Sequence, residues 1–123
     1  MRADSGARLT DVFDDELVEL AVEVFSMLAD PTRVRIVQAL RPGELSVNTL
    51  ADVVAKSATA VSQHLAKLRL SRLVTTRRDG NRIFYRLANE HVGQLVTDAL
   101  HQAEHSVVDQ PRHHRTTAEK TDD

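Results

Sequence analysis

The chain has 123 residues, of which 41% are hydrophobic and 28% charged, a composition typical of one soluble domain with a modest core. It has no cysteine, which excludes disulfides and thiolate metal sites and leaves imidazole, carboxylate, backbone or water as metal ligands. No apolar run approaches the roughly 18 residues of a membrane span, and residues 1–11 lack the apolar core of a signal peptide. We therefore expect a cytoplasmic protein with no membrane partner.

The net charge of −2 hides an uneven distribution of charge along the chain. Residues 1–32 carry 2 basic and 8 acidic side chains, residues 33–86 carry 11 basic and 3 acidic, and residues 87–123 carry 3 basic and 7 acidic. A basic central segment between acidic flanks favours a nucleic-acid partner over the alternative interpretation, an ordinary solvated surface.

Helical periodicity dominates the first half of the chain. Residues 1–13 have few apolar side chains and are expected to form a flexible N-terminus. From Asp14 onwards, apolar residues recur with helical spacing in DDELVELAVEVFSMLAD. Asp30 and Pro31 are then expected to cap and open a second helix, which ends before Pro42.

A helix-turn-helix is predicted in the middle of the chain. Ser46 is the expected N-cap of a short helix over SVNTLADVV, and a further helix is predicted over TAVSQHLAKLRLSR after the tight turn AKSA. Two short helices joined by a tight turn, the second of them polar, are typical of this DNA-binding motif.

A basic β-hairpin and a last helix complete the predicted domain. Two β-rich runs in LVTTRRDGNRIFYRL flank Asp79-Gly80, a strong hairpin turn signal, and three arginines lie at its tip. A final helix is expected over about 89–106, followed by a flexible polar tail over 107–123. The predicted fold is mainly α with a β-hairpin wing, a winged helix-turn-helix over 14–106 in the order α-α-α-α-β-β-α.

The motifs LADPTRVRIV, VSQHLAKLR and RRDGNRIFYRL together resemble the ArsR/SmtB family of metal-sensing winged-helix repressors, over roughly residues 15–106. Within that family, NEHV, AEH and PRHH are most similar to the nickel and cobalt sensors of the KmtR type. The resemblance implies a homodimer formed through the first and last helices, and a target promoter that controls a metal exporter.

The predicted polar helix of the helix-turn-helix would enter the major groove of operator DNA with its N-terminal residues near the base edges. The candidates for base contacts are Thr59, Ser62 and Gln63. His64 is interpreted as a structural histidine hydrogen-bonded at the base of this helix, with a DNA contact as the alternative. Basic side chains are expected to contact phosphates, which sets affinity and salt dependence; they are Lys67, Arg69, Arg77, Arg78 and Arg82.

Five of the six histidines lie between residues 91 and 114. His91 and His105 share one face of the predicted last helix but are separated by about 21 Å along its axis, too far for one ion to bridge. Two antiparallel copies of this helix, crossing near Asp98, would bring His91 of one protomer to Glu104 and His105 of its partner. Symmetry would then give two metal sites per dimer.

The tail adds two histidines, so the predicted ligands are His91, Glu104, His105, His113 and His114, the set that the resemblance also implies. Five nitrogen and oxygen ligands suit six-coordinate Ni²⁺ or Co²⁺ better than tetrahedral Zn²⁺. His101, one helical turn before His105, is an alternative ligand. Asn89 stands where some sensors have a ligand Asp, which makes a zinc-type site less favoured.

The sequence therefore predicts a homodimeric transcriptional repressor that binds operator DNA and is released by Ni²⁺ or Co²⁺. A zinc-responsive repressor of the same fold is one alternative, and a nickel or cobalt buffer or delivery protein that uses the histidine-rich end is another. A metal hydrolase would need an open coordination position and a base in a cleft, and the sequence offers no nucleophile or phosphate loop. We therefore expect no enzymatic activity.

Overall fold

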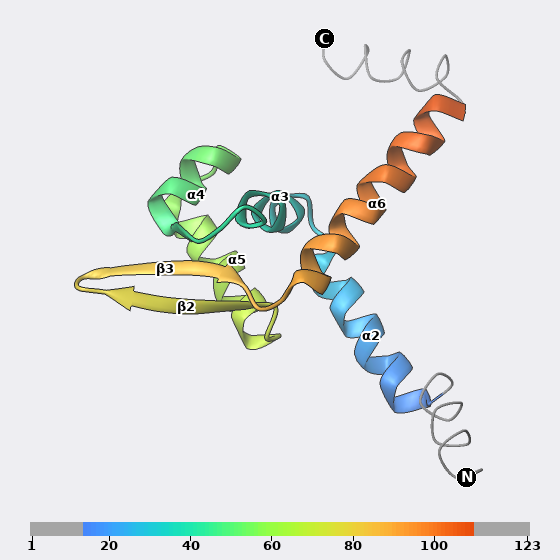
Figure 1. Ribbon diagram of the computed structural model, residues 1–123, viewed down its shortest axis with the longest axis horizontal. Helices are drawn as coiled ribbons and strands as arrows, with labels where there is room; N and C mark the ends of the chain where they lie inside the picture. The colour runs from blue at the N-terminus through green and yellow to red at the C-terminus, as the bar shows by residue number, and fades with distance from the viewer. Residues whose placement is uncertain (1–13, 110–123) are drawn as a thin grey trace.

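The computed structural model describes residues 14–109, and it confirms the predicted winged helix-turn-helix (Figure 1). The elements follow in the order α2 (Asp15–Leu28), α3 (Pro31–Leu40), β1 (Leu45–Ser46), α4 (Val47–Val54), α5 (Ala58–Leu70), β2 (Val74–Asp79), β3 (Arg82–Leu87) and α6 (Glu90–Asp109). The hairpin of β2 and β3, called the wing below, projects to one side, and α2 and α6 leave the core on the other side in diverging directions.

Side-chain caps explain where the helices begin. The Asp14 carboxylate accepts hydrogen bonds from the first backbone N–H groups of α2. Asp30 caps α3 by accepting from the Arg33 backbone N–H at 3.0 Å, and Ser46 caps α4 by accepting from the Thr49 N–H at 3.3 Å. The caps predicted at Asp30 and Ser46 are therefore confirmed.

One end of the last helix differs from the prediction. α6 continues to Asp109, three residues beyond the expected end at 106. Ser106 lies within this helix, and its hydroxyl donates to the Gln102 carbonyl one turn earlier, at 3.1 Å. The segments predicted to be flexible lie outside the described residues, except for 107–109, which are helical.

The core lies where α3, α4 and α5 meet beneath the sheet and the first half of α6. It contains aliphatic side chains that are almost completely buried, among them Ile36, Leu50, Val61, Leu65, Leu68, Val74, Val92 and Val96. Burial of a side chain of this kind contributes about 1.5–3 kcal/mol, so these positions fix how the recognition helix α5 sits on the body.

The sheet has three antiparallel strands in the order β1-β3-β2. β2 and β3 form the predicted hairpin, with Val74 opposite Leu87 at its base and Asp79 opposite Arg82 at its tip. Gly80 adopts φ +65 in the turn, a conformation that glycine accepts without steric cost. The two-residue strand β1, which pairs Leu45 with Tyr85, was not predicted because so short a strand shows no alternation.

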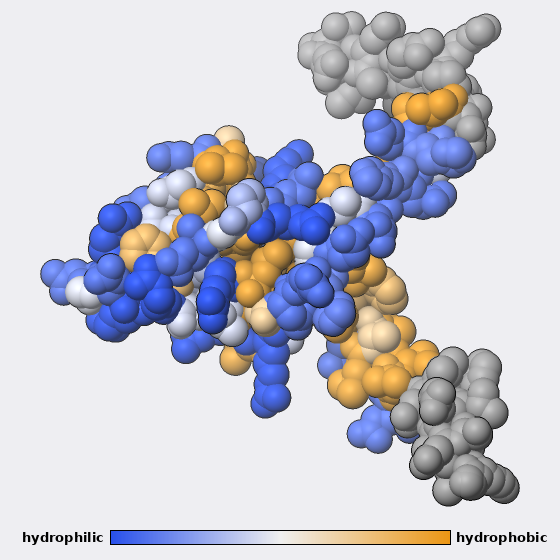
Figure 2. All heavy atoms as spheres, viewed as in Figure 1, coloured by the Kyte–Doolittle hydropathy of each residue, from blue (hydrophilic) through white to orange (hydrophobic). Residues whose placement is uncertain are grey.

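Large apolar side chains remain exposed on α2 and on the second half of α6, and Figure 2 shows them as an apolar surface along α2. Leu20 and Phe25 of α2 are 51% and 56% exposed, and Val108 of α6 is 63% exposed. An apolar cavity of about 240 Å³ lies between these helices and α3, lined by Phe25, Leu28, Val34, Leu95, Val96, Ala99 and Leu100. Contiguous apolar surface of this kind is typical of a protein–protein interface.

None of the described helices is long and apolar enough to cross a membrane.

Candidate DNA interface and metal ligands

The turn between α4 and α5 gives the helix-turn-helix its shape. Ala55 takes the left-handed conformation, with φ 58 and ψ 46, which ends α4 and redirects the chain. Ser57 then caps α5 by accepting a hydrogen bond from the Ala60 backbone N–H at 3.1 Å. Val61, Leu65 and Leu68 bury one face of α5 completely, so the opposite face is presented to solvent.

The side chains predicted to read bases lie on the exposed face of the recognition helix. Thr59, Ser62 and Gln63 are all exposed near the N-terminal end of α5, and Lys67 and Arg69 are exposed further along it. This placement agrees with a recognition helix that enters the major groove with its first turns. The individual contacts to bases and phosphates stay predictions.

His64 is partly buried and hydrogen-bonded to the body of the protein, in agreement with its interpretation as a structural histidine. Its Nδ1 accepts a hydrogen bond from Arg33 Nε at 3.0 Å, and Asp30 Oδ2 lies 3.8 Å from the same nitrogen. The backbone N–H of Arg33, with a smaller contribution from His64, holds the pKa of the Asp30 carboxyl below its usual value. Sequence reasoning did not single out Arg33, although the motif LADPTRVRIV contains it.

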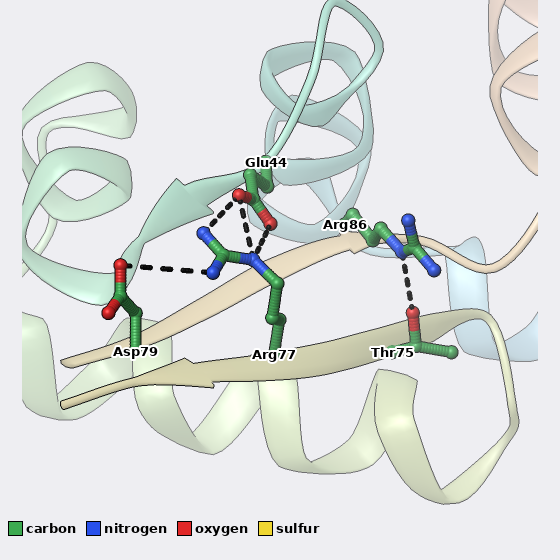
Figure 3. Close-up of polar contacts among 5 residues, drawn as sticks. All are labelled: Glu44, Thr75, Arg77, Asp79 and Arg86. Carbon is green, nitrogen blue, oxygen red and sulfur yellow. Dashed lines mark hydrogen bonds and ion pairs between the residues drawn. The ribbon is translucent and has the colours of Figure 1, made fainter. Parts of the chain in front are cut away.

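The wing arginines differ in what they contact (Figure 3). Arg77 reaches from β2 across β3 to Glu44, and its Nε donates to both carboxylate oxygens at 3.0 Å while Nη2 lies 2.5 Å from Oε1. Its guanidinium also lies 4.9 Å from the centroid of the Phe84 ring and 3.9 Å from an Asp79 oxygen. The hydrogen bonds from Arg77 lower the pKa of Glu44, and those to Glu44 raise the pKa of Arg77.

The two arginines nearer the tip have fewer internal partners. The Arg82 guanidinium also lies over the Phe84 ring, 5.0 Å from the ring centroid. Arg78 is exposed and makes no hydrogen bond or ion pair within the described part of the chain. The guanidinium of Arg77 is therefore already paired with a carboxylate, whereas those of Arg78 and Arg82 are not paired with one within residues 14–109. Glu44 and Phe84 determine this difference, and the sequence analysis missed both. Glu44 lies 33 residues before Arg77, and Phe84 lies on the neighbouring strand β3.

The predicted metal ligands lie along α6. His91 is exposed in its first turn, and Glu104 and His105 are exposed three to four turns later. Among residues 14–109, no group of three or more histidine or acidic side chains lies close enough together to hold a metal ion. One protomer therefore does not bring the three predicted ligands of α6 together. His113 and His114 lie outside the described residues.

Two polar neighbours of these ligands have structural roles on α6. The Asn89 side-chain oxygen accepts a hydrogen bond from the His91 backbone N–H at 2.9 Å, so Asn89 caps the helix. Asp98, the predicted crossing point, accepts from Gln94 Nε2 at 2.8 Å. His101 is exposed on the same helix, one turn before His105.

Comparison with known proteins identifies the family. A family model described as "Bacterial regulatory protein, arsR family" matches residues 30–76. The chain is 60% identical over 115 residues to the HTH-type transcriptional regulator KmtR from Mycobacterium tuberculosis, which covers 94% of this chain and 86% of the relative. The protein belongs to the ArsR family. The resemblance inferred from the motifs is thereby confirmed.

Other ArsR-family relatives match across the same domain. The HTH-type transcriptional repressor SmtB from Mycobacterium tuberculosis is 38% identical over 88 residues, which cover 72% of this chain and 65% of the relative. A solution structure of a homodimeric winged helix-turn-helix DNA-binding domain from Mycobacterium bovis aligns with a TM-score of 0.68 at 30% identity, covering 75% of this chain and 85% of that one. The ArsR-family protein described here is a DNA-binding transcriptional regulator and not an enzyme, as its sequence predicts.

Proposed function

We propose that this ArsR-family regulator is a homodimeric repressor that binds operator DNA and releases it when Ni²⁺ or Co²⁺ binds. The observation that carries the proposal is the placement of the predicted ligands at opposite ends of α6. His91 and His105 are about 21 Å apart along the helix axis, so a site that uses both must take them from two chains. The regulated gene is proposed to encode a metal exporter, as the resemblance implies.

A second copy of the chain is the proposed occupant of the apolar surface on α2 and α6. The exposed side chains of α2 and the cavity beside Phe25 and Leu95 are continuous with the helix that carries the metal ligands. The homodimeric domain from Mycobacterium bovis, which shares the fold, supports this arrangement. Residues 14–109 are proposed to form the DNA-binding and dimerisation domain, and the segment from 110 onwards to supply two further ligands.

DNA is proposed to be read by two copies of α5 on the symmetric dimer, one in each half-site. Thr59, Ser62 and Gln63 are proposed to contact bases. Lys67, Arg69, Arg78 and Arg82 are proposed to contact phosphates, and each such contact steepens the dependence of affinity on salt concentration. Arg77 is proposed to act differently, because Glu44 already pairs with its guanidinium.

The donor set fits a borderline metal ion. The proposed ligands are His91 from one protomer with Glu104, His105, His113 and His114 from its partner, and the chain has no thiolate that would favour a soft metal. When bound, the ion would supply a cross-link between the two α6 helices. His91 would hold the N-terminal turn of one α6 against the C-terminal half of the other. The two recognition helices, which must match the half-site spacing, would thereby change their relative placement.

A zinc-responsive repressor is less well supported than a nickel or cobalt sensor. A four-ligand zinc site of the kind weighed from the sequence would use a carboxylate at position 89, and Asn89 instead caps α6 through its side-chain oxygen. A metal buffer or delivery protein would not explain an exposed recognition helix beside a basic wing, so that alternative is not retained.

The proposal is tested by titrating Ni²⁺, Co²⁺ and Zn²⁺ into the protein bound to its own labelled upstream DNA, with fluorescence anisotropy as the readout. Ni²⁺ or Co²⁺ should weaken DNA binding by about 5- to 150-fold, the range of a coupling of about 1–3 kcal/mol. Absorption in the ligand-field region should show six-coordinate Co²⁺, and the His113→Ala, His114→Ala double variant should lose that spectrum while it still binds DNA. Unchanged DNA affinity with all three metals would refute the proposal, and release by Zn²⁺ alone would establish the zinc alternative.

A further inference from the structure

The C-terminal end of α3 contacts α6 through the side chain of Arg41. Arg41 lies so close to Gly93 that a Cβ atom added there would be 2.7 Å from Arg41 Nε and 3.1 Å from its Cδ and Cγ. Arg41 Nη1 also donates a hydrogen bond to Thr97 Oγ1, one turn further along α6. The arginine side chain therefore lies along α6, in space that exists because residue 93 has no side chain.

Three residues later, Glu44 of the same segment contacts the wing. Glu44 accepts from Arg77 through both of its oxygens, and Arg77 reaches it by crossing β3 (Figure 3). The Arg77 guanidinium lies 4.9 Å from the centroid of the Phe84 ring. Bidentate pairing fixes orientation as well as distance, since two parallel N–H···O bonds leave the guanidinium little freedom to rotate. The position of Glu44 therefore constrains the position of β2, and with it the wing tip.

The contact of Arg41 with α6 and the contact of Glu44 with the wing are joined by a short stretch of chain. Only Pro42 and Gly43 lie between Arg41 and Glu44, and proline fixes one of the backbone angles in between. The Gly43 backbone N–H donates to the Leu40 carbonyl at 3.2 Å, which anchors the turn to the end of α3. The side chains that make these contacts line one cavity of about 480 Å³. The start of α6 lines the same cavity at Asn89, Glu90 and Gly93.

We propose that the segment Arg41–Glu44, called the 41–44 link, couples the N-terminal end of α6, where His91 lies, to the wing. The inference rests on the proposed metal-responsive function. His91 lies two residues before Gly93, so a displacement of the first turns of α6 acts directly on Arg41. The link passes that displacement to Glu44 and Arg77, which changes where Arg78 and Arg82 meet the DNA backbone. Arg41, Glu44 and Arg77 are thus positioning residues that need not touch DNA or metal.

Three variants test the 41–44 link. Arg41→Gln removes the arginine contact with α6, Glu44→Gln removes the ion pair with the wing, and the double variant removes both. Arg35→Gln is the matched control, because Arg35 is exposed on α3 and makes no hydrogen bond or ion pair within the described residues. For each full-length protein, three quantities are measured: the affinity for Ni²⁺ or Co²⁺, the affinity for DNA without metal, and the factor by which metal weakens DNA binding.

Each single variant should reduce the metal-induced change in DNA affinity by about fivefold or more, while its metal affinity stays within about twofold of wild type. The metal-induced change in DNA affinity should fall no further in the double variant than in the more affected single variant, because the two contacts act in series. Without metal, Glu44→Gln should accelerate amide hydrogen exchange in β2 and β3, since the wing is no longer held. Arg41→Gln should leave that exchange unchanged, because it does not contact the wing.

The outcomes separate the link from the proposed function. If wild-type protein shows no metal-induced change in DNA affinity, the proposed function and the link both fail. If wild type responds and the Arg41→Gln and Glu44→Gln variants respond as fully as Arg35→Gln, the link is wrong and the function stands. Losses that add in the double variant, or a parallel loss of metal affinity, would also overturn the link.

Discussion

Arg33 joins His64 of the recognition helix to the last turn of α2. Its Nε donates to His64 Nδ1 at 3.0 Å, and its Nη1 donates to the Met27 carbonyl at 3.0 Å and lies 3.2 Å from the Met27 sulfur. α2 is the helix whose apolar side chains remain exposed and for which a second copy of the chain is the proposed partner. A single guanidinium therefore holds the recognition helix to the proposed dimerisation helix.

We predict that His64→Leu lowers the free energy of unfolding by about 1–2 kcal/mol, because Arg33 Nε loses its acceptor at a site where the imidazole is only 23% exposed. His64→Asn should recover at least half of that loss, since its side chain keeps an acceptor at the δ position. Urea denaturation measures both values. Equal losses for Leu and Asn would show that the imidazole contributes by packing and not through this hydrogen bond.

A second prediction concerns acid stability and Asp30. Its native pKa is depressed below 3.8, first by the hydrogen bond from the Arg33 backbone N–H. The native carboxylate therefore binds a proton less tightly than the unfolded one. Its contribution to stability is fully present above the unfolded pKa, and it is lost as the pH falls through the lower native pKa.

The Asp30→Asn variant keeps a cap acceptor but cannot titrate. Urea denaturation at several pH values should show that wild type is more stable than Asp30→Asn at neutral pH, and that this difference shrinks below about pH 4. A difference that stays constant with pH would contradict the prediction.

The fold could be predicted from the sequence because its signals are local. The spacing of Val61, Leu65 and Leu68 defines the buried face of α5, and the turn at Gly80 follows from the preference of Asp-Gly for hairpins. β1 was missed because its pairing partner Tyr85 lies far along the chain, and two residues carry no periodic pattern.

The candidate site could be predicted only in part. Composition shows that Arg77 is basic, but only the folded sheet places it against Glu44, 33 residues earlier. Arg41 is likewise an ordinary arginine in the sequence, and its position on Gly93 depends on how α3 packs against α6. The ligand set on α6 stays a prediction, which rests on helical geometry because that geometry alone fixes the distance between His91 and His105.

The left-handed residue in the helix-turn-helix leads to a third prediction. Ala55 has φ 58, where an L-residue costs about 1–2 kcal/mol, and glycine costs about 0.5–1 kcal/mol in backbone entropy. Ala55→Gly should therefore leave the free energy of unfolding unchanged or raise it by up to about 1.5 kcal/mol. Ala66→Gly, an exposed position within α5, is the matched control and should lower it by about 1 kcal/mol. The prediction is wrong if both substitutions destabilise the protein equally.

A fourth prediction separates the wing arginines by the salt dependence of DNA binding. Arg78→Ala should lower the slope of log K against log salt by about 0.9, the value of one phosphate contact. Arg77→Ala should weaken DNA binding while it leaves the slope unchanged, because its guanidinium is paired with Glu44. Fluorescence anisotropy over a range of salt concentrations measures both, with Arg35→Ala as the control. If Arg77→Ala lowers the slope as much as Arg78→Ala does, Arg77 contacts the backbone directly.

The last prediction tests whether the metal site is shared between protomers. The His91→Ala and His105→Ala variants each lack one ligand in both symmetric sites of their own homodimer. In a heterodimer of the two, one site loses both histidines, and the other takes His91 from the His105→Ala chain and His105 from the His91→Ala chain. Metal binding should therefore recover in the mixture, to about one tight site per heterodimer.

A site within one chain predicts no recovery, because every chain in the mixture is defective. The control mixes His91→Ala with the His91→Ala, His101→Ala double variant after the same exchange treatment, and it should bind no more metal than its parents. Subunit exchange is confirmed with differently tagged chains, and metal binding is measured by equilibrium dialysis with Ni²⁺. A mixture that exchanges subunits and still binds no more than its parents would rule out the shared site. His101 with His105, one turn apart on α6, would then be the better pair, since such a pair can chelate a metal on a single helix.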